Sequence, residues 1–119
     1  MKSREQALAV ARALEDARAK DISILDVAEI SGFADYFVIA TGTSTRHVRT
    51  LAERALEALG HSARKRSGVE GLEACRWVLI DSFDVIVHLF LDEAREYYGL
   101  ERLWDEAESV SLAPTAAVR

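Results

Sequence analysis

The first twenty residues carry apolar side chains at the spacing of an amphipathic helix. These side chains recur every three or four positions and alternate with charged residues, which places them on one side of a helix. The pattern therefore predicts a helix over about residues 3–19, with a buried stripe formed by Ala7, Val10, Ala11, Leu14 and Ala17.

Two segments with the pattern of strands follow this helix. In DISILDV, residues 21–27, the side chains alternate with a period of two, as in a half-buried strand. Residues 30–33 are predicted to form a turn, in which Gly32 supplies a permissive backbone. The continuous apolar run of DYFVIATG, residues 35–42, is typical of a strand that is covered on both faces.

The next segment has the pattern of a second helix. Ser44 or Thr45 is the predicted N-cap and Gly60 the predicted end. Its predicted buried stripe consists of Val48, Leu51, Ala52, Ala55, Leu56 and Leu59. A short strand around residues 62–65 should return parallel to the preceding strand, as strand–helix–strand crossovers do. Residues 66–73 are predicted to form a glycine-containing loop.

The remaining chain supplies a hairpin and a short helix. RWVLIDSFDVIVHLF, residues 76–90, predicts two strands around a tight turn. Residues 92–98 are predicted to form a helix that ends at Gly99, and residues 106–119 a flexible tail. The order of elements predicts one α/β domain over residues 1–105, a mixed β-sheet of about five strands with helices packed on it.

The hairpin has two predicted faces of different chemistry. A turn centred on Ser82 and Phe83 would pair residues whose numbers sum to 165. One face is then almost purely aliphatic and belongs in the core, with the pairs Arg76–Leu89, Val78–Val87 and Ile80–Val85. The other face carries an indole, an imidazole and two carboxylates, in the pairs Trp77–His88, Leu79–Ile86 and Asp81–Asp84.

This second face supports two interpretations. Its mixture of an aromatic residue, aliphatic residues and charges is typical of protein interfaces, so it is a candidate docking surface. Alternatively, a helix of the same protein covers Trp77 and Leu79, and His88 is hydrogen-bonded at the edge. The residues alone favour neither interpretation. The composition of the face is typical of an interface, whereas a tryptophan in a strand is more often part of a core.

Composition and charge narrow the class of protein. The chain has 119 residues, enough for one hydrophobic core, and a net charge of −5, which argues against a protein that mainly coats phosphates. Residues 46–66 are locally basic, and a solvated face explains them better than a nucleic-acid contact. We find no membrane-spanning run and no secretory signal. The single cysteine, Cys75, cannot form an internal disulfide, which is consistent with a reducing cytoplasm.

No convincing catalytic or metal site is predicted. Asp81 and Asp84 could bind Mg²⁺ as in nucleotidyl transfer, but turn-forming aspartates are the more common explanation. The segment at residues 41–44 lacks the spacing of a phosphate-binding loop and is better explained as a helix cap. His47 has no nearby nucleophile in the sequence, His61 is expected at the surface, and Cys75 is expected to be a packing thiol.

Several motifs together resemble the ribosomal silencing factor family, RsfS, also called the Iojap family. They are DYFVIATGTSTRHV at residues 35–48, the Glu70-Gly71 pair, RWVLIDSFDVIVHLF at residues 76–90, and the tail pattern Arg95, Tyr98, Leu100, Glu101, Leu103 and Trp104. The resemblance covers about residues 4–105 in the same order. It implies a fold similar to nucleotidyltransferases without their catalytic motif, no reaction and no cofactor.

The resemblance also implies a partner and the residues that bind it. Members of this family bind the large ribosomal subunit through its ribosomal protein fourteen, block joining with the small subunit, repress translation when nutrients are scarce, and commonly form homodimers. The residues that would bind the partner are Trp77, Leu79, Ile80, Asp81, Asp84, Ile86 and His88, and those available for dimer contacts are Leu100, Leu103, Trp104 and the first helix.

The sequence departs from the family pattern at one position, and two alternative functions stay open. Relatives often have glycine in the turn where this chain has Phe83, which changes the turn type and the placement of the two aspartates. A nucleotidyltransferase-like enzyme would use Asp81 and Asp84. An RNA-binding module would use Arg64, Lys65 and Arg66, with ribosomal RNA as its peripheral contact.

Overall fold

The computed structural model describes residues 3–31, 34–60, 68–82, 84–92 and 108–109. Its elements follow in chain order: α1 (Ser3–Asp16), β1 (Lys20–Asp26), α2 (Ala28–Ser31), β2 (Tyr36–Gly42), α3 (Thr45–Ala58), β3 (Val69–Glu70), β4 (Trp77–Ser82), β5 (Val85–Leu91) and β6 (Glu108–Ser109).

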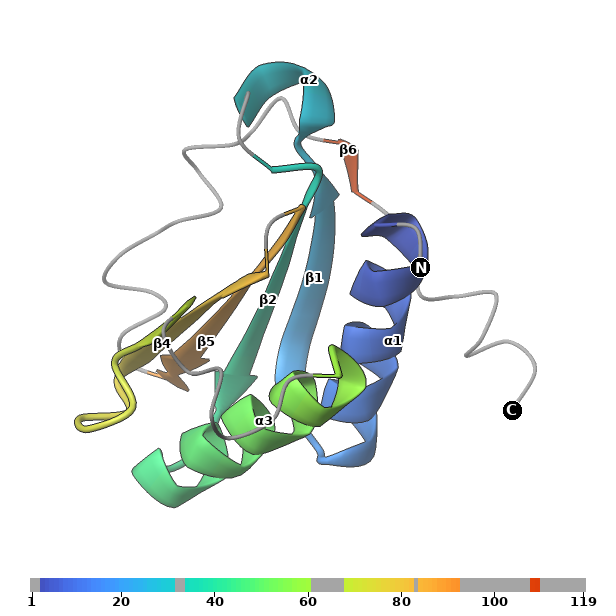
Figure 1. Ribbon diagram of the computed structural model, residues 1–119. Helices are drawn as coiled ribbons and strands as arrows, with labels where there is room; N and C mark the ends of the chain where they lie inside the picture. Colours follow the sequence, from blue (N-terminus) through green and yellow to red (C-terminus); the bar gives the residue numbers. More distant parts are fainter. Residues whose placement is uncertain (1–2, 32–33, 61–67, 83, 93–107, 110–119) are drawn as a thin grey trace.

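A single mixed β-sheet organises these elements. The strand order is β3-β4-β5-β2-β1-β6. Among the described strands, β2 and β5 pair in parallel, and the other neighbouring pairs run antiparallel. Figure 1 shows that α1 and α3 lie next to one another on the same face of the sheet. The predicted α/β fold with a mixed sheet is therefore confirmed.

The helices α1 and α3 bury one face of the sheet, which we call the helix-covered face. Their apolar stripes meet alternate residues of the central strands. The core formed there includes Val10 and Leu14 of α1, Leu51 of α3, and the strand residues Val38, Val78, Ile80, Val85, Val87 and Leu89. The aliphatic face predicted for the hairpin is thus part of the core, as expected.

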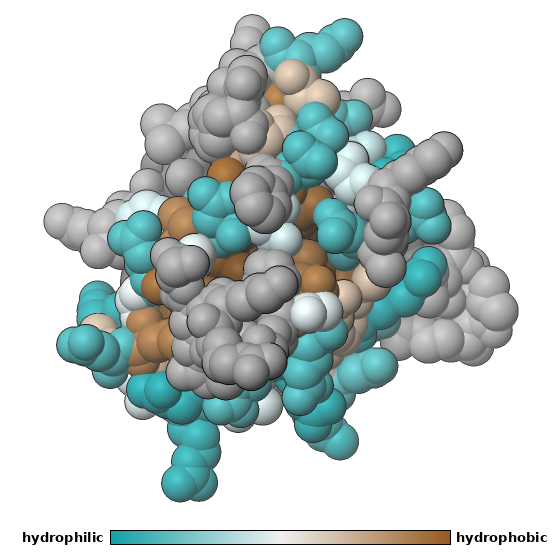
Figure 2. Space-filling view, viewed as in Figure 1, coloured by the Kyte–Doolittle hydropathy of each residue, from teal (hydrophilic) through white to brown (hydrophobic). Residues whose placement is uncertain are grey.

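The opposite face of the sheet is built from the other set of alternating residues, and we call it the aromatic face. Its buried cluster consists of Leu25, Val27, Ala34, Phe37, Ile39, Ile86 and Phe90, with Trp77, Leu79 and Leu91 packed against it. Side chains alternate between the two sides of a strand, so the aromatic face points away from α1 and α3. Figure 2 shows hydrophilic residues around the periphery of the molecule and hydrophobic ones nearer its middle.

The helix α3 begins and ends as predicted. Ser44 is its N-cap, and the Ser44 hydroxyl accepts a hydrogen bond from the backbone N–H of His47 at 3.1 Å. Gly60, just beyond the C-cap Leu59, has a positive φ of 79°, which glycine adopts without strain. The buried residues of α3 are Val48, Leu51, Ala52, Ala55 and Leu56.

Several boundaries differ from the prediction. The first helix ends at Asp16, and β1 is not half-buried, because Ile24 and Leu25 are buried on opposite faces of the sheet. The helical turn α2 occupies Ala28–Ser31, within the segment expected to turn. Further along, Val69–Glu70 forms the edge strand β3 in a segment expected to be a loop, since it can pair with β4.

Other predictions fall partly or wholly outside the described residues. The strand around residues 62–65, Gly32 and nearly all of the helix at residues 92–98 lie there. In the tail predicted at residues 106–119, Glu108–Ser109 forms β6 and pairs with β1, so these two residues belong to the sheet. No helix among the described residues is both long and apolar enough to cross a membrane.

Candidate docking surface

The pairing of β4 with β5 sets which side chains meet on the aromatic face. Trp77 lies opposite Phe90, Leu79 opposite His88, and Asp81 opposite Ile86. The predicted pairing was wrong by two residues, because Ser82 pairs with Val85 and not with Phe83. A shift of two residues leaves the strand residues Trp77, Leu79, Asp81, Ile86 and His88 on their predicted face, whereas Asp84 lies in the turn.

Aromatic rings from three strands meet on this face. The Trp77 and Phe90 rings are stacked, with centroids 5.1 Å apart and an interplanar angle of 27°. The imidazole of His88 meets Phe37 of β2 edge to face at 5.1 Å and lies parallel to Phe90 at 6.4 Å. Aromatic pairs favour both geometries, which add to the stabilisation from burial. The cluster thus holds the Trp77 ring on a packed base.

A hydrogen bond joins the two polar rings of the cluster. The Trp77 Nε1–H donates to His88 Nδ1 over 3.1 Å. Because Nδ1 accepts, the neutral imidazole carries its proton on Nε2. Among the described residues, Nε2 has no hydrogen-bond partner although it is buried. An unpaired buried donor costs about 1–3 kcal/mol of stability. The Nε2–H of His88 therefore destabilises the folded protein relative to an apolar side chain at the same position.

Burial also controls the charge of His88. Its side chain is 5% exposed, and desolvation lowers its pKa from 6.5 to about 4. Burial favours the neutral form because a charged imidazolium would lose its hydration. Protonation would also remove the lone pair of Nδ1 that accepts from Trp77. His88 is therefore neutral at physiological pH, and the bond to Trp77 is intact.

The residues predicted to bind the partner differ in their exposure. Trp77 and Leu79 are half-buried, and Asp81 and Asp84 are exposed. Ile86 and His88 are 7% and 5% exposed and lie beneath the surface. Ile80 is fully buried on the helix-covered face. Its place in the predicted set is therefore corrected: Ile80 supports β4 from behind, because it points to the other side of the strand.

The sequence interpretation missed Phe37 and Phe90 as members of this cluster. Phe90 has the same parity along β5 as Ile86 and His88, so strand alternation could have placed it there. Phe37 comes from β2, where it lies opposite Ile86 in the parallel ladder. No signal in the sequence gives the register between two strands that are distant along the chain.

The two aspartates do not form a facing pair of carboxylates. Asp81 is paired with Ile86, whereas Asp84 lies in the turn. The backbone carbonyl of Asp84 accepts hydrogen bonds from the N–H groups of Asp35 and Tyr36 at 2.7 and 3.0 Å. The turn is therefore attached to the start of β2, and Asp84 has a structural role. Among the described residues, no group of three or more His, Cys, Asp or Glu side chains could hold a metal ion.

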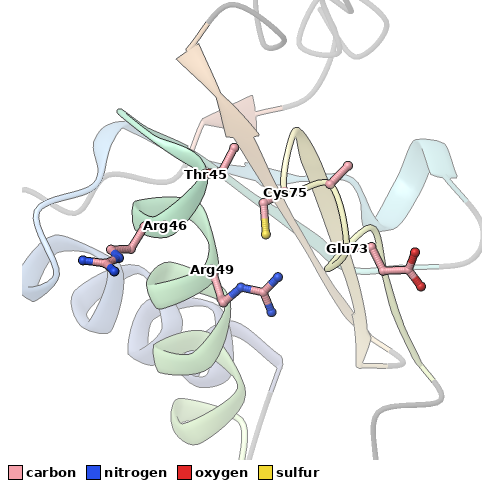
Figure 3. A pocket seen from close by; sticks show the side chains of 6 residues that line it. Thr45, Arg46, Arg49, Glu73 and Cys75 are labelled. Carbon is pink, nitrogen blue, oxygen red and sulfur yellow. The ribbon is translucent and has the colours of Figure 1, made fainter.

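A cavity of about 300 Å³ lies at the beginning of α3, away from the aromatic face. Thr45, Arg46 and Arg49 of α3 line it, together with residues 73–75. Figure 3 shows the Cys75 thiol between α3 and the segment that leads into β4. This thiol and the Arg49 guanidinium both donate to the Leu72 carbonyl, at 3.0 and 2.7 Å. Cys75 is 1% exposed, as expected for a packing thiol.

His47 has a structural role at the same end of α3. Its Nδ1 accepts from the Thr43 backbone N–H at 3.0 Å, and its Nε2 lies 2.8 Å from the Ala17 carbonyl. This side chain therefore joins the start of α3 to the end of α1. The helix-cap interpretation of residues 41–44 is consistent with these contacts. His61, Leu100, Leu103 and Trp104 lie outside the described residues.

Comparison with known proteins identifies the family. The profile described as "Ribosomal silencing factor during starvation" matches residues 1–119. The chain belongs to the RsfS family. The ribosomal silencing factor RsfS of Bacillus subtilis is 40% identical over 102 residues, which cover 86% of each chain. The crystal structure of a protein from Chromobacterium violaceum matches with a TM-score of 0.81; the two chains are 37% identical, and the match covers 88% of each.

A more distant relative comes from an animal. The mouse protein named "Mitochondrial assembly of ribosomal large subunit protein 1" is 35% identical over 94 residues, which cover 76% of this chain and 41% of the mouse protein. The RsfS resemblance seen in the sequence motifs is thus confirmed. A ribosome-associated regulatory role follows from membership of the family.

Proposed function

We propose that this protein binds the large ribosomal subunit through the aromatic face, docks on ribosomal protein fourteen of that subunit, and prevents joining with the small subunit. Membership of the RsfS family supports a ribosomal partner. The name of the mouse relative supports the large subunit in particular. The observation that carries the proposal is the half-buried Trp77, which packs on an aromatic base on the side of the sheet opposite to α1 and α3.

The composition of this face suits a protein partner. Trp77 and Leu79 offer apolar surface, and the exposed Asp81 and Asp84 flank it with negative charge. Tryptophan is enriched among the residues that dominate binding energy, and charged residues are typical of the rim. Stacking on Phe90 and the bond to His88 hold the indole before binding. Such preorganisation reduces the entropy lost on association.

Inhibition by this mechanism is steric and requires no reaction. The molecule extends about 30 Å in each direction, with principal extents of 32, 32 and 30 Å. A body of this size on the large subunit would occupy space that the small subunit needs. Repression of translation under nutrient limitation then follows from occupancy alone, in the cytoplasm and without a cofactor. The protein is also proposed to form a homodimer, with contacts at Leu100, Leu103 and Trp104.

The test uses purified components. We expect the protein to capture isolated ribosomal protein fourteen, and to capture large subunits equally well before and after nuclease removes accessible RNA. Added to separated subunits, it should reduce the fraction that joins, measured by sucrose-gradient sedimentation. Loss of capture after nuclease, with a steep salt dependence, would instead favour the RNA-binding module that uses Arg64, Lys65 and Arg66. Normal subunit joining in the presence of bound protein would contradict the steric mechanism.

A further inference from the structure

The only polar atom of the Trp77 side chain is already used inside the protein. Its Nε1–H donates to His88 Nδ1 at 3.1 Å, and indole has no other donor and no acceptor. A partner that contacts Trp77 therefore meets its carbon surface. An indole that is free to turn would instead present its N–H in several directions, and the apolar surface would not be fixed.

His88 is better fixed in the fold than Trp77. It lies on β5, which is paired with β4 on one side and with β2 on the other. Its side chain is 5% exposed and packs against Phe37 and Phe90. Trp77 is half-buried at the start of β4, next to the two-residue edge strand β3. The hydrogen bond thus connects a fixed interior residue to a more exposed one.

The chemistry of His88 is poorly explained by packing alone. Its Nε2–H is buried and has no partner among the described residues, and an aliphatic side chain would fill the position without that cost. A buried polar group without a partner is uncommon in folded proteins, so its presence calls for an explanation. The feature that an aliphatic side chain could not supply is the acceptor Nδ1, which receives the bond from Trp77.

We propose that His88 is a positioning residue that holds the Trp77 indole in the orientation in which it meets the ribosomal partner. This inference rests on the proposed function, because it assumes that Trp77 is an anchor of the docking surface. His88 acts on binding through Trp77 and does not itself contact the partner. The partner should accordingly offer Trp77 an apolar contact and no hydrogen-bond acceptor.

A double-mutant cycle tests the inference. His88→Leu removes the acceptor, and His88→Asn retains an oxygen near the position of Nδ1. We expect His88→Leu to bind isolated ribosomal protein fourteen about three- to tenfold more weakly, the range expected for one hydrogen bond. His88→Asn should bind within about twofold of the wild type, since it preserves that bond. Circular dichroism and thermal unfolding would confirm that each variant is folded.

The Trp77→Phe background separates positioning from general structural damage. Phenylalanine keeps an aromatic ring but has no N–H, so His88→Leu should not weaken binding further in this background. An equal loss in both backgrounds would overturn the inference, and so would wild-type binding by folded His88→Leu. If Trp77→Ala also bound normally, the docking surface itself would be refuted. Weak binding by Trp77→Ala with normal binding by His88→Leu would refute only the role of His88.

A measurement on the unmodified protein covers the case in which His88→Leu does not fold. Nuclear magnetic resonance can detect a scalar coupling between Trp77 Nε1 and His88 Nδ1 across their hydrogen bond. We expect this coupling in the free protein and also in the complex with isolated ribosomal protein fourteen. Its absence in the free protein, or its loss on binding, would overturn the inference.

Discussion

Trp77 and Phe90 lie directly opposite each other in the β4–β5 ladder, and their ring centroids are 5.1 Å apart. Phe90 is fully buried, whereas Trp77 is half-buried. One ring therefore belongs to the interior and supports the other from beneath. The stacking of Trp77 on Phe90 gives the aromatic face an anchor with a fixed position.

Trp77→Ala should weaken binding to large ribosomal subunits by at least about 2 kcal/mol, the loss expected at an interface anchor. The fold should persist, because Trp77 is at the margin of its cluster and the core on the helix-covered face is untouched. Co-sedimentation with large subunits over a range of protein concentrations measures the affinity. Glu53→Ala is the matched control, since Glu53 is exposed on α3, on the other side of the sheet. Wild-type affinity in folded Trp77→Ala would refute the docking surface.

The wild-type protein should show no Mg²⁺-dependent nucleotide transfer. Asp81 and Asp84 do not face each other across the hairpin, and Asp84 lies in the turn. The variant with Asp81→Asn and Asp84→Asn should lose less than about 1 kcal/mol of binding per residue, as is usual for charges at a rim. An assay with labelled nucleotide and a binding titration measure the two properties. Turnover in the wild type that the double variant abolishes would revive the enzyme hypothesis.

His88 should make the protein less stable as the pH falls. Its pKa is lowered to about 4 by burial, against 6.5 when unfolded. Between these values the unfolded chain binds the proton and the folded chain does not, so the free energy of unfolding decreases as the pH is lowered. The decrease from His88 should reach roughly 3 kcal/mol across this window.

Urea unfolding of wild type and His88→Leu as a function of pH isolates the contribution of His88 to the free energy of unfolding. The replacement leaves the carboxylates of the protein unchanged, so their contribution to the pH dependence is common to wild type and variant. The difference in urea unfolding free energy between wild type and variant should therefore change between pH 6.5 and pH 4. Parallel curves for the two proteins would show that His88 is not a buried neutral histidine.

Gly71→Ala should destabilise the protein more than Gly60→Ala. Both glycines have a positive φ, 90° for Gly71 and 79° for Gly60, so alanine is strained at either position by about 1–2 kcal/mol. A Cβ at Gly71 would lie 2.1 Å from the Trp77 carbonyl oxygen, whereas a Cβ at Gly60 meets nothing within 4 Å. The backbone of β4 would have to move, which should add at least about 1 kcal/mol. Equal losses in chemical denaturation would contradict the close approach of Gly71 to Trp77.

The sequence by itself determined the two long helices, the central strands and the faces of the hairpin. Apolar periodicity located α1, α3 and the central strands, because helices and strands repeat their side-chain directions over 3.6 and 2 residues. Alternation alone placed Trp77, Leu79 and His88 on one face of the hairpin, and an error of two residues in the pairing did not change that. The family motifs could also be recognised in the sequence, since they depend only on the identity and order of residues.

Only the tertiary structure decided which residues of that face are accessible and how its rings are joined. The parallel pairing of β2 with β5 brings Phe37 against His88, although these residues are 51 positions apart in the chain. The same packing buries His88 and Ile86 and leaves Trp77 half-buried. Burial and the bond from Trp77 to His88 depend on neighbours that are distant in sequence, and local periodicity carries no information about them.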